Sequence, residues 1–152
     1  MFRKRLSKVV MMLSLGVFMM VVSLPVCQAA SGKISIQAIT AWPKTTFMVQ
    51  NFMRFMDRAN EKAANVYPGQ FEIVYKGGPE VISFKEQVEA VRTGLVDMVF
   101  TATSYYTSIV PVGDGFSASA FKPWEEREKG IFTFMQKIHE EKANAYFLSR
   151  MG

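Results

Sequence analysis

The chain has 152 residues, of which 18 are basic and 13 acidic, and a formal net charge of +5. Four of these charges, on Arg3, Lys4, Arg5 and Lys8, lie at the N-terminus, so the rest of the chain carries a net charge of only +1. The high isoelectric point therefore gives no indication of nucleic-acid binding. With one cysteine and one histidine, the chain has too few ligands of these types for a typical zinc site.

Residues 1–29 are predicted to be a cleavable signal peptide. A basic start is followed by the apolar run 9–26 and by small residues, Cys27 and Ala29, at positions −3 and −1 of a cleavage after Ala29. Two alternatives stay open, namely retention of the apolar run as a membrane anchor and lipidation at Cys27. We favour cleavage and a periplasmic location, because bulky Val26 is unusual before a lipidated cysteine.

A strand and a long amphipathic helix are predicted next. Lys33–Ile39 is short and apolar at alternate positions, as in a strand. Thr45 or Thr46 can cap the helix that follows, and Tyr67-Pro68-Gly69 ends it. Eight apolar residues on this helix predict one broad face that packs in the core: Phe47, Met48, Phe52, Phe55, Met56, Ala59, Ala63 and Val66.

A strand–helix–strand unit follows. Phe71–Tyr75 has the composition of a partly buried strand, and Leu95–Thr101 that of a buried parallel strand. Between them, Ser83 and Glu86 form an S-x-x-E capping box for a helix that ends near Gly94. In an open α/β sheet, the loops that leave the carboxyl ends of the strands bind ligands.

The remainder of the chain is predicted to be less regular and then helical. Ile109–Ser119 is rich in glycine, proline and serine, which favours a loop or short helical turns. Pro123 is expected to open a single long helix. The only histidine, His139, lies beside two glutamates and is expected at the surface. We find no phosphate-binding glycine motif and no nucleophile–base pair, so neither an enzyme, a cofactor nor a metal is predicted.

Three loops are expected to meet at one edge of the sheet and to bind a ligand there. Ala41–Thr45 offers the flat ring and N–H group of Trp42, although this residue could equally be an ordinary packing residue, as could Tyr105. Gly77–Phe84 brings backbone close to a ligand, with Glu80 available to a ligand hydroxyl or ammonium but repelling a carboxylate. Thr101–Tyr106 supplies hydroxyl groups and rings. The candidate ligand-binding residues are Trp42, Glu80, Thr103, Ser104 and Tyr105.

Three segments resemble the solute-binding subunit of tripartite ATP-independent periplasmic (TRAP) transporters. They are ISIQAITAWP at 34–43, YKGGPE at 75–80 and EQVEAVRTGLVDMVFTATSYY at 86–106. The resemblance implies a lobe of the periplasmic-binding-protein type II fold at residues 30–122 and a long helix at 123–152 that leads towards a second lobe. The implied function is capture of a small organic acid and its delivery to the membrane subunits of the transporter.

The resemblance also implies an arginine that the family carries on a strand of its second lobe, where it pairs with the ligand carboxylate. Arg92 and Arg150 match no such position. We therefore expect an N-terminal fragment whose second lobe is missing. A periplasmic module that presents its ligand to a signalling protein is the alternative function. An exported enzyme on a similar scaffold is disfavoured by the lack of catalytic groups.

Overall fold

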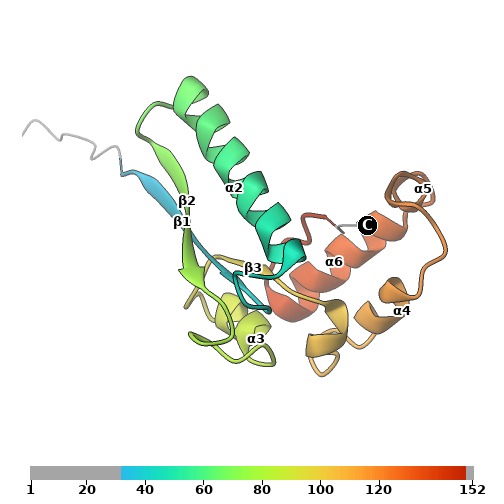
Figure 1. Cartoon of the computed structure of the whole chain (residues 1–152). Helices are drawn as coiled ribbons and strands as arrows, with labels where there is room; N and C mark the ends of the chain where they lie inside the picture. The colour runs from blue at the N-terminus through green and yellow to red at the C-terminus, as the bar shows by residue number, and fades with distance from the viewer. Residues whose placement is uncertain (1–31, 150–152) are drawn as a thin grey trace, which may run out of the picture. The chain divides into compact units, whose positions relative to one another are not determined.

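The computed structural model describes residues 32–149, except for the side chains of Phe116 and Ser117. The predicted signal peptide, its cleavage site and Cys27 lie outside these residues. The described elements follow one another as β1 (Ile34–Thr40), α2 (Phe47–Val66), β2 (Phe71–Gly77), α3 (Gln87–Arg92), β3 (Met98–Phe100), the 3₁₀ helix η1 (Thr103–Tyr106), α4 (Gly113–Ser117), α5 (Pro123–Glu128) and α6 (Ile131–Ala143) (Figure 1).

The three strands form a parallel sheet in the order β2-β1-β3. Parallel neighbours need crossover connections, and here α2 links β1 to β2 while α3 links β2 to β3. The predicted α/β class is confirmed to this extent.

The third strand is shorter than the predicted Leu95–Thr101. It pairs only with the carboxyl end of β1, where Ala38, Ile39 and Thr40 lie opposite Met98, Val99 and Phe100. Leu95 is 66% exposed, and the Asp97 carboxylate accepts the Gln37 N–H at 2.8 Å. The Asp97 N–H also donates to the Gln37 carbonyl at 3.0 Å, whereas the N–H groups of Leu95 and Val96 donate back to the Ala90 carbonyl and do not join the sheet.

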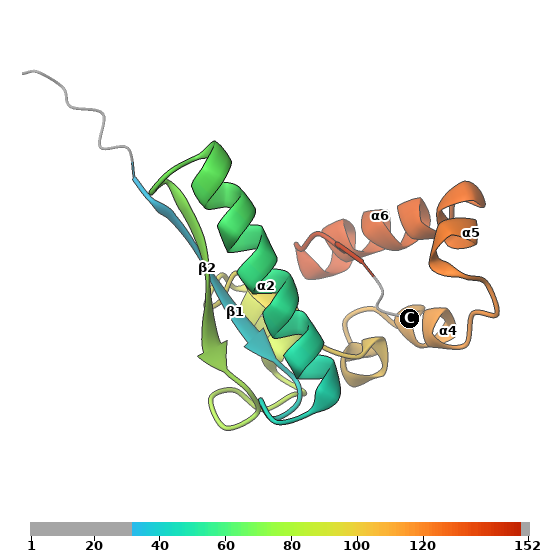
Figure 2. The same ribbon diagram turned by 45° about the horizontal axis from the view of Figure 1, so that its top comes forward.

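The two faces of β1 are covered by different helices. Ala38 packs with Phe52, Met56 and Ile73 beneath α2, which lies along β1 and β2 (Figure 2). Its neighbour Ile39 packs with the α3 side of the molecule in a cluster that contains Ala90 and Val96. Successive side chains of a strand point to opposite faces, so this alternation places the sheet between α2 and α3.

The apolar face of α2 is narrower than predicted. Val49, Phe52 and Met56 are its buried residues, whereas Phe47 is 76% exposed and Phe55 47% exposed. Only the part of the helix that faces Ala38 and Ile73 of the sheet is covered, so the prediction that the whole face lies in the core is wrong.

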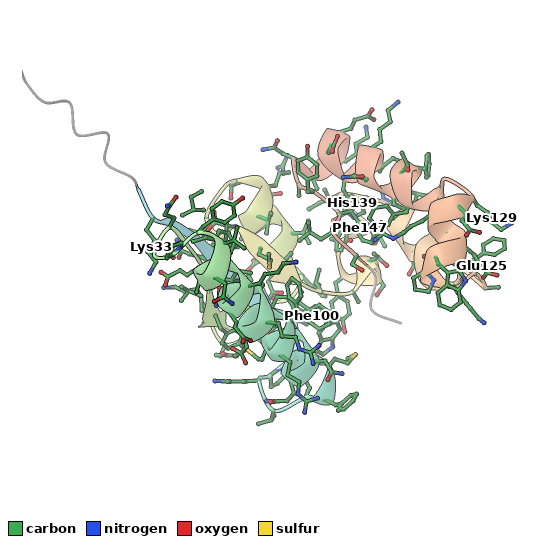
Figure 3. All side chains as sticks on the ribbon, turned by 90° about the horizontal axis from the view of Figure 1, so that it is seen from above. Lys33, Phe100, Glu125, Lys129, His139 and Phe147 are labelled. Carbon is green, nitrogen blue, oxygen red and sulfur yellow. The ribbon has the colours of Figure 1, made fainter. Side chains whose placement is uncertain are left out.

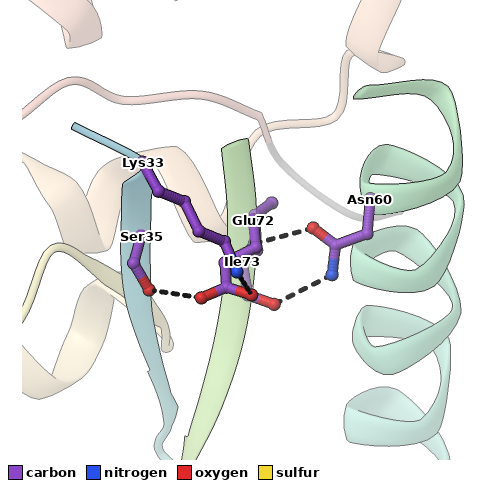
Figure 4. A network of polar contacts seen from close by, with 5 residues as sticks. All are labelled: Lys33, Ser35, Asn60, Glu72 and Ile73. Atoms are coloured by element: carbon purple, nitrogen blue, oxygen red, sulfur yellow. Dashed lines mark hydrogen bonds and ion pairs between the residues drawn. The ribbon is translucent and has the colours of Figure 1, made fainter. Parts of the chain in front are cut away.

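Polar side chains connect β2 to two neighbours, the helix α2 and the strand β1. The Asn60 amide donates to the Ile73 carbonyl at 2.9 Å and accepts the Ile73 N–H at 2.7 Å (Figure 4). On the neighbouring strand pair, the Glu72 carboxylate accepts from Ser35 at 3.0 Å and pairs with Lys33. The hydrogen bonds from Lys33 and Ser35 lower the pKa of Glu72.

The two predicted helix caps do not form. Thr46 is the N-cap residue of α2, but its hydroxyl donates to the Pro43 carbonyl at 2.8 Å instead of accepting from the helix. The Ser83–Glu86 capping box is also absent, because α3 begins only at Gln87 and the preceding residues form turns. The predicted end of α3 is confirmed, with Gly94 at φ +75° just beyond it.

The predicted single helix from Pro123 is in fact two helices. Gly130, at φ +75°, separates α5 from α6, and a residue in this left-handed conformation cannot continue a right-handed helix. The segment predicted as loop or short turns contains the five-residue helix α4. Among the helices within residues 32–149, none combines the length and hydrophobicity needed to cross a membrane.

Candidate functional site

The carboxyl ends of the three strands lie at one edge of the sheet. Thr40 at the end of β1 pairs with Phe100 at the end of β3, and Ile39 pairs with Gly77 at the end of β2. The three loops that leave these strands therefore start side by side, as the parallel topology requires.

Aromatic rings from all three loops contact one another at this edge. The centroid of the Trp42 ring lies 5.4 Å from that of Phe100 and 5.8 Å from that of Tyr105. The Tyr105 ring in turn lies 4.7 Å from the ring of Phe84. We call these four half-buried residues the aromatic cluster. The structure thus brings Trp42 and Tyr105 together, and their rings pack on each other while remaining partly open to solvent.

The loop after β2 approaches the loop after β1 without a side chain between them. A Cβ atom at Gly78 would lie 2.9 Å from the Trp42 carbonyl oxygen and 2.9 Å from Glu80 Oε2. Glu80 Oε1 accepts the Gly78 N–H at 2.7 Å. This hydrogen bond, together with one from the N–H of Glu80 itself, lowers the pKa of the Glu80 carboxyl. Glu80 is therefore an ionised, exposed residue that holds the loop in place beside Trp42.

The other two candidate residues, Thr103 and Ser104, occupy different surroundings in η1. Thr103 packs against Gly113 of α4, since a Cβ atom at Gly113 would lie 3.2 Å from the Thr103 Cβ. Ser104 is exposed and directly precedes Tyr105. Ser104 thus borders the aromatic cluster, whereas the side chain of Thr103 is engaged with α4.

Several polar residues at the edge were missed in the sequence. The Thr40 hydroxyl donates to the Trp42 carbonyl at 2.8 Å and lies 3.2 Å from the Tyr75 hydroxyl. The buried amide of Gln87 donates to the carbonyls of Thr40 at 2.8 Å and Ile82 at 2.9 Å. No partner of Gln87 Oε1 is seen within residues 32–149. In the sequence, the indication that Gln87 is buried was its place next to Val88, an apolar position of the predicted helix.

Two lysines also border the edge. The Lys44 ammonium lies 5.6 Å from the centroid of the Tyr75 ring, and that of Lys85 lies 5.9 Å from the centroid of the Phe84 ring. Cations at this distance from a ring face are attracted to it, so Tyr75 favours a position of Lys44 at the sheet edge, and Phe84 keeps the charge of Lys85 near the aromatic cluster. The edge therefore combines flat apolar surfaces, hydroxyl groups and two positive charges, which suits a small anion.

His139 is buried, contrary to its predicted surface position. It is 5% exposed, and both ring nitrogens have partners, Met135 O at 2.7 Å and the Tyr106 hydroxyl at 2.8 Å. These hydrogen bonds remove the main cost of burying an imidazole. Burial lowers the pKa of His139, although the hydrogen bond to the Met135 carbonyl acts to raise it. Burial also raises the pKa of Tyr106 to about 12.

A hollow outside the sheet edge lies on the exposed side of α2. Its described lining residues all belong to this helix: Asn51, Arg54, Phe55, Arg58, Ala59 and Lys62. In the described part of the chain, no three histidine, cysteine, aspartate or glutamate residues lie close enough together to hold a metal ion.

The fold and the edge define the class of protein as an α/β domain with a parallel sheet and a mixed aromatic and cationic surface at the carboxyl ends of its strands. A search of protein-family models finds no match to the chain. The resemblance to TRAP solute-binding subunits therefore stays a prediction.

Proposed function

We propose that the chain is an exported solute-binding protein of the TRAP type, and that residues 30–122 form a lobe of the periplasmic-binding-protein fold. It captures a small organic acid at the carboxyl edge of the sheet and delivers it to the membrane subunits of a transporter. The observation that supports this most directly is the meeting of Trp42, Phe84 and Tyr105, one ring from each of three separate loops.

The residues at this edge suit an organic acid with a flat or apolar body. The rings of the aromatic cluster supply surfaces for that body. Lys44 and Lys85 attract the carboxylate of the ligand, and Ser104 offers a hydroxyl donor. The ionised Glu80 repels a carboxylate and accepts a hydrogen bond from a hydroxyl, which favours acids that carry a hydroxyl group at the other end.

Tryptophan fluorescence gives a direct test, because the chain contains only two tryptophans, Trp42 and Trp124. The 152-residue chain is expressed with its own leader, and the Trp124→Phe variant leaves Trp42 as its only tryptophan reporter. We expect a saturable change in its emission with 2-hydroxy mono- or dicarboxylates, and none with the corresponding neutral amides. Tyr105→Ala should weaken this binding by about tenfold or more, equivalent to about 1.4 kcal/mol.

The matched control is Trp42→Phe, which keeps Trp124 on α5, away from the edge, and should show no saturable change. The proposal fails if no carboxylate changes the Trp42 emission at concentrations up to about 10 mM. It also fails if the change is the same in Tyr105→Ala.

Export and the transport partner are tested separately from ligand binding. Mass spectrometry of the purified protein should place its N-terminus at Ala30, and an intact Met1 or a lipid on Cys27 would contradict a cleaved signal peptide. Genes for membrane transport subunits beside this one would support delivery to a transporter. A neighbouring sensor-kinase gene would instead support a sensing module.

A further inference from the structure

One buried hydrogen bond connects the candidate site to α6. The Tyr106 hydroxyl and His139 Nε2 are 2.8 Å apart, and the two rings meet edge to face with centroids 5.6 Å apart. Both side chains are 5% exposed. Tyr106 is the last residue of η1 and directly follows Tyr105 of the aromatic cluster, so this bond fixes the end of the segment that carries Tyr105.

The hydrogen bonds of His139 specify its protonation state. Nδ1 can only donate to the Met135 carbonyl, which lies 2.7 Å away. In the neutral ring Nε2 then carries no hydrogen and accepts the hydroxyl hydrogen of Tyr106. A proton added to Nε2 turns this acceptor into a donor. The Tyr106 hydroxyl must then turn its own hydrogen elsewhere, and within residues 32–149 it has no second hydrogen-bond partner.

The surroundings of His139 do not compensate an added positive charge. Figure 3 shows His139 of α6 next to Phe147, whose ring centroid lies 4.9 Å away. On α3, which also packs against α6, the charged groups are Glu89 and Arg92, and these pair with each other at 2.7 Å.

The other titratable groups on neighbouring elements are Tyr105 of η1 and Tyr146 of the segment after α6, which is 71% exposed. Helix α5 also packs against α6, and of its charged residues Glu125, Glu126, Arg127 and Glu128 only Glu126 is buried. The charged residues of α6 itself are exposed: Lys137, Glu140, Glu141 and Lys142. Among the described residues, no carboxylate forms a hydrogen bond or ion pair with the ring of His139. An imidazolium at this position would therefore be buried without a carboxylate hydrogen-bonded to it.

We propose that His139 is a positioning residue for the aromatic cluster: in its neutral form it holds η1 by accepting from the Tyr106 hydroxyl, and a proton on Nε2 reverses this hydrogen bond, leaves the hydroxyl hydrogen without its acceptor and so shifts η1, and Tyr105 with it, relative to Trp42. The geometric basis is a short chain of contacts. His139 bonds to Tyr106, Tyr106 follows Tyr105 in the sequence, and the ring centroids of Tyr105 and Trp42 are 5.8 Å apart. The further step, that acidification weakens ligand binding, rests on the proposed function.

Proton NMR can test the positioning role without any ligand. His139 is the only histidine, so its ring signals are unambiguous, and the indole N–H signals of Trp42 and Trp124 report on the cluster and on α5 respectively. The 152-residue chain is titrated from pH 8 to pH 4.5. We expect His139 to titrate with a midpoint below about 6.5. The Trp42 signal should shift with the same midpoint, while that of Trp124 stays constant.

Two variants separate positioning from a merely structural role. In Tyr106→Phe the ring stays but the hydroxyl is lost, so the Trp42 signal should no longer follow the titration of His139. In His139→Gln the side chain is neutral throughout, so the Trp42 signal should be independent of pH. The proposal is overturned if the wild-type Trp42 signal is constant while His139 titrates, if it follows His139 equally in Tyr106→Phe, or if Trp124 shifts together with Trp42.

Ligand titration on either side of the midpoint distinguishes this proposal from the proposed function. We expect at least a fivefold loss of carboxylate affinity on acidification in the wild type and less than twofold in His139→Gln, provided that both bind at pH 8. If Trp42 follows His139 but no acid binds at any pH, the proposed function fails and the positioning role stands. If acids bind but Trp42 ignores His139, the positioning role fails alone.

Discussion

Replacing Gly78 by alanine tests whether the loop after β2 must lie against the loop after β1. The new Cβ would come within 2.9 Å of both the Trp42 carbonyl oxygen and Glu80 Oε2, and within 3.5 Å of Thr40 Oγ1. The Glu80 side chain can turn away, but only by giving up its bond to the Gly78 N–H. The Trp42 carbonyl is backbone and accepts from Thr40 at 2.8 Å, so it cannot move independently. The two loops must therefore separate by several tenths of an ångström.

Forcing an extra methyl group into a packed site in this way costs about 1 to 3 kcal/mol. Urea unfolding measures it, with Trp42 emission as a second readout of a displaced loop. Gly115→Ala is the matched control. Its Cβ would meet no atom within 4 Å, and alanine in the helix α4 is expected to be neutral or stabilising by up to about 1 kcal/mol. If Gly78→Ala unfolds at the same urea concentration as Gly115→Ala, the close approach of the two loops is not real.

Two further substitutions and the dependence of stability on pH test other contacts of the fold. Asn60→Ala removes both hydrogen bonds to Ile73 and should lower the free energy of unfolding by about 2 to 3 kcal/mol in urea, and a loss below about 0.5 kcal/mol would contradict the pairing. Gln87→Met leaves two backbone carbonyls at the sheet edge without their donor, so we expect a loss of about 2 to 4 kcal/mol, measured in the same way. The pKa of Tyr106 is raised from 10.0 to about 12, so the folded state holds this proton more tightly than the unfolded state. Stability should therefore fall between about pH 10 and 12 by up to roughly 3 kcal/mol, and Tyr106→Phe should remove that part of the decline.

The order of elements could be predicted from the sequence because each depends on local composition. The alternation in Phe71–Tyr75, the glycine and proline punctuation and the apolar spacing of the long helix all act within one element. The boundaries that were wrong depend on residues far apart in the chain. The start of β3 depends on its pairing with β1, and Asp97 just before it contacts Gln37, 60 positions away, through both its N–H and its carboxylate. The break at Gly130 is different, since a glycine inside a helical pattern was visible in the sequence.

For the candidate site, topology was predictable and detailed contacts were not. Parallel strands place their following loops at one edge, which is why Trp42 and Tyr105 come together as the loop argument requires. The Thr40–Tyr75 contact depends on the register of two strands, which no local pattern specifies. His139 was placed at the surface because of its acidic neighbours. Its spacing of four residues from the buried Met135 indicated the opposite, since such residues share a helix face.

The aromatic cluster also connects two separate parts of the core. Phe100 stacks on Phe52 of α2 with centroids 5.0 Å apart, so Trp42 reaches the core beneath α2 through Phe100. Tyr106, next to Tyr105, belongs to the core cluster that contains Ala143 of α6. A ligand that orders Trp42 and Tyr105 therefore acts on both core clusters at once. Its binding should raise the stability of α2 and α6 together, because both must be in place for the rings that contact it to meet.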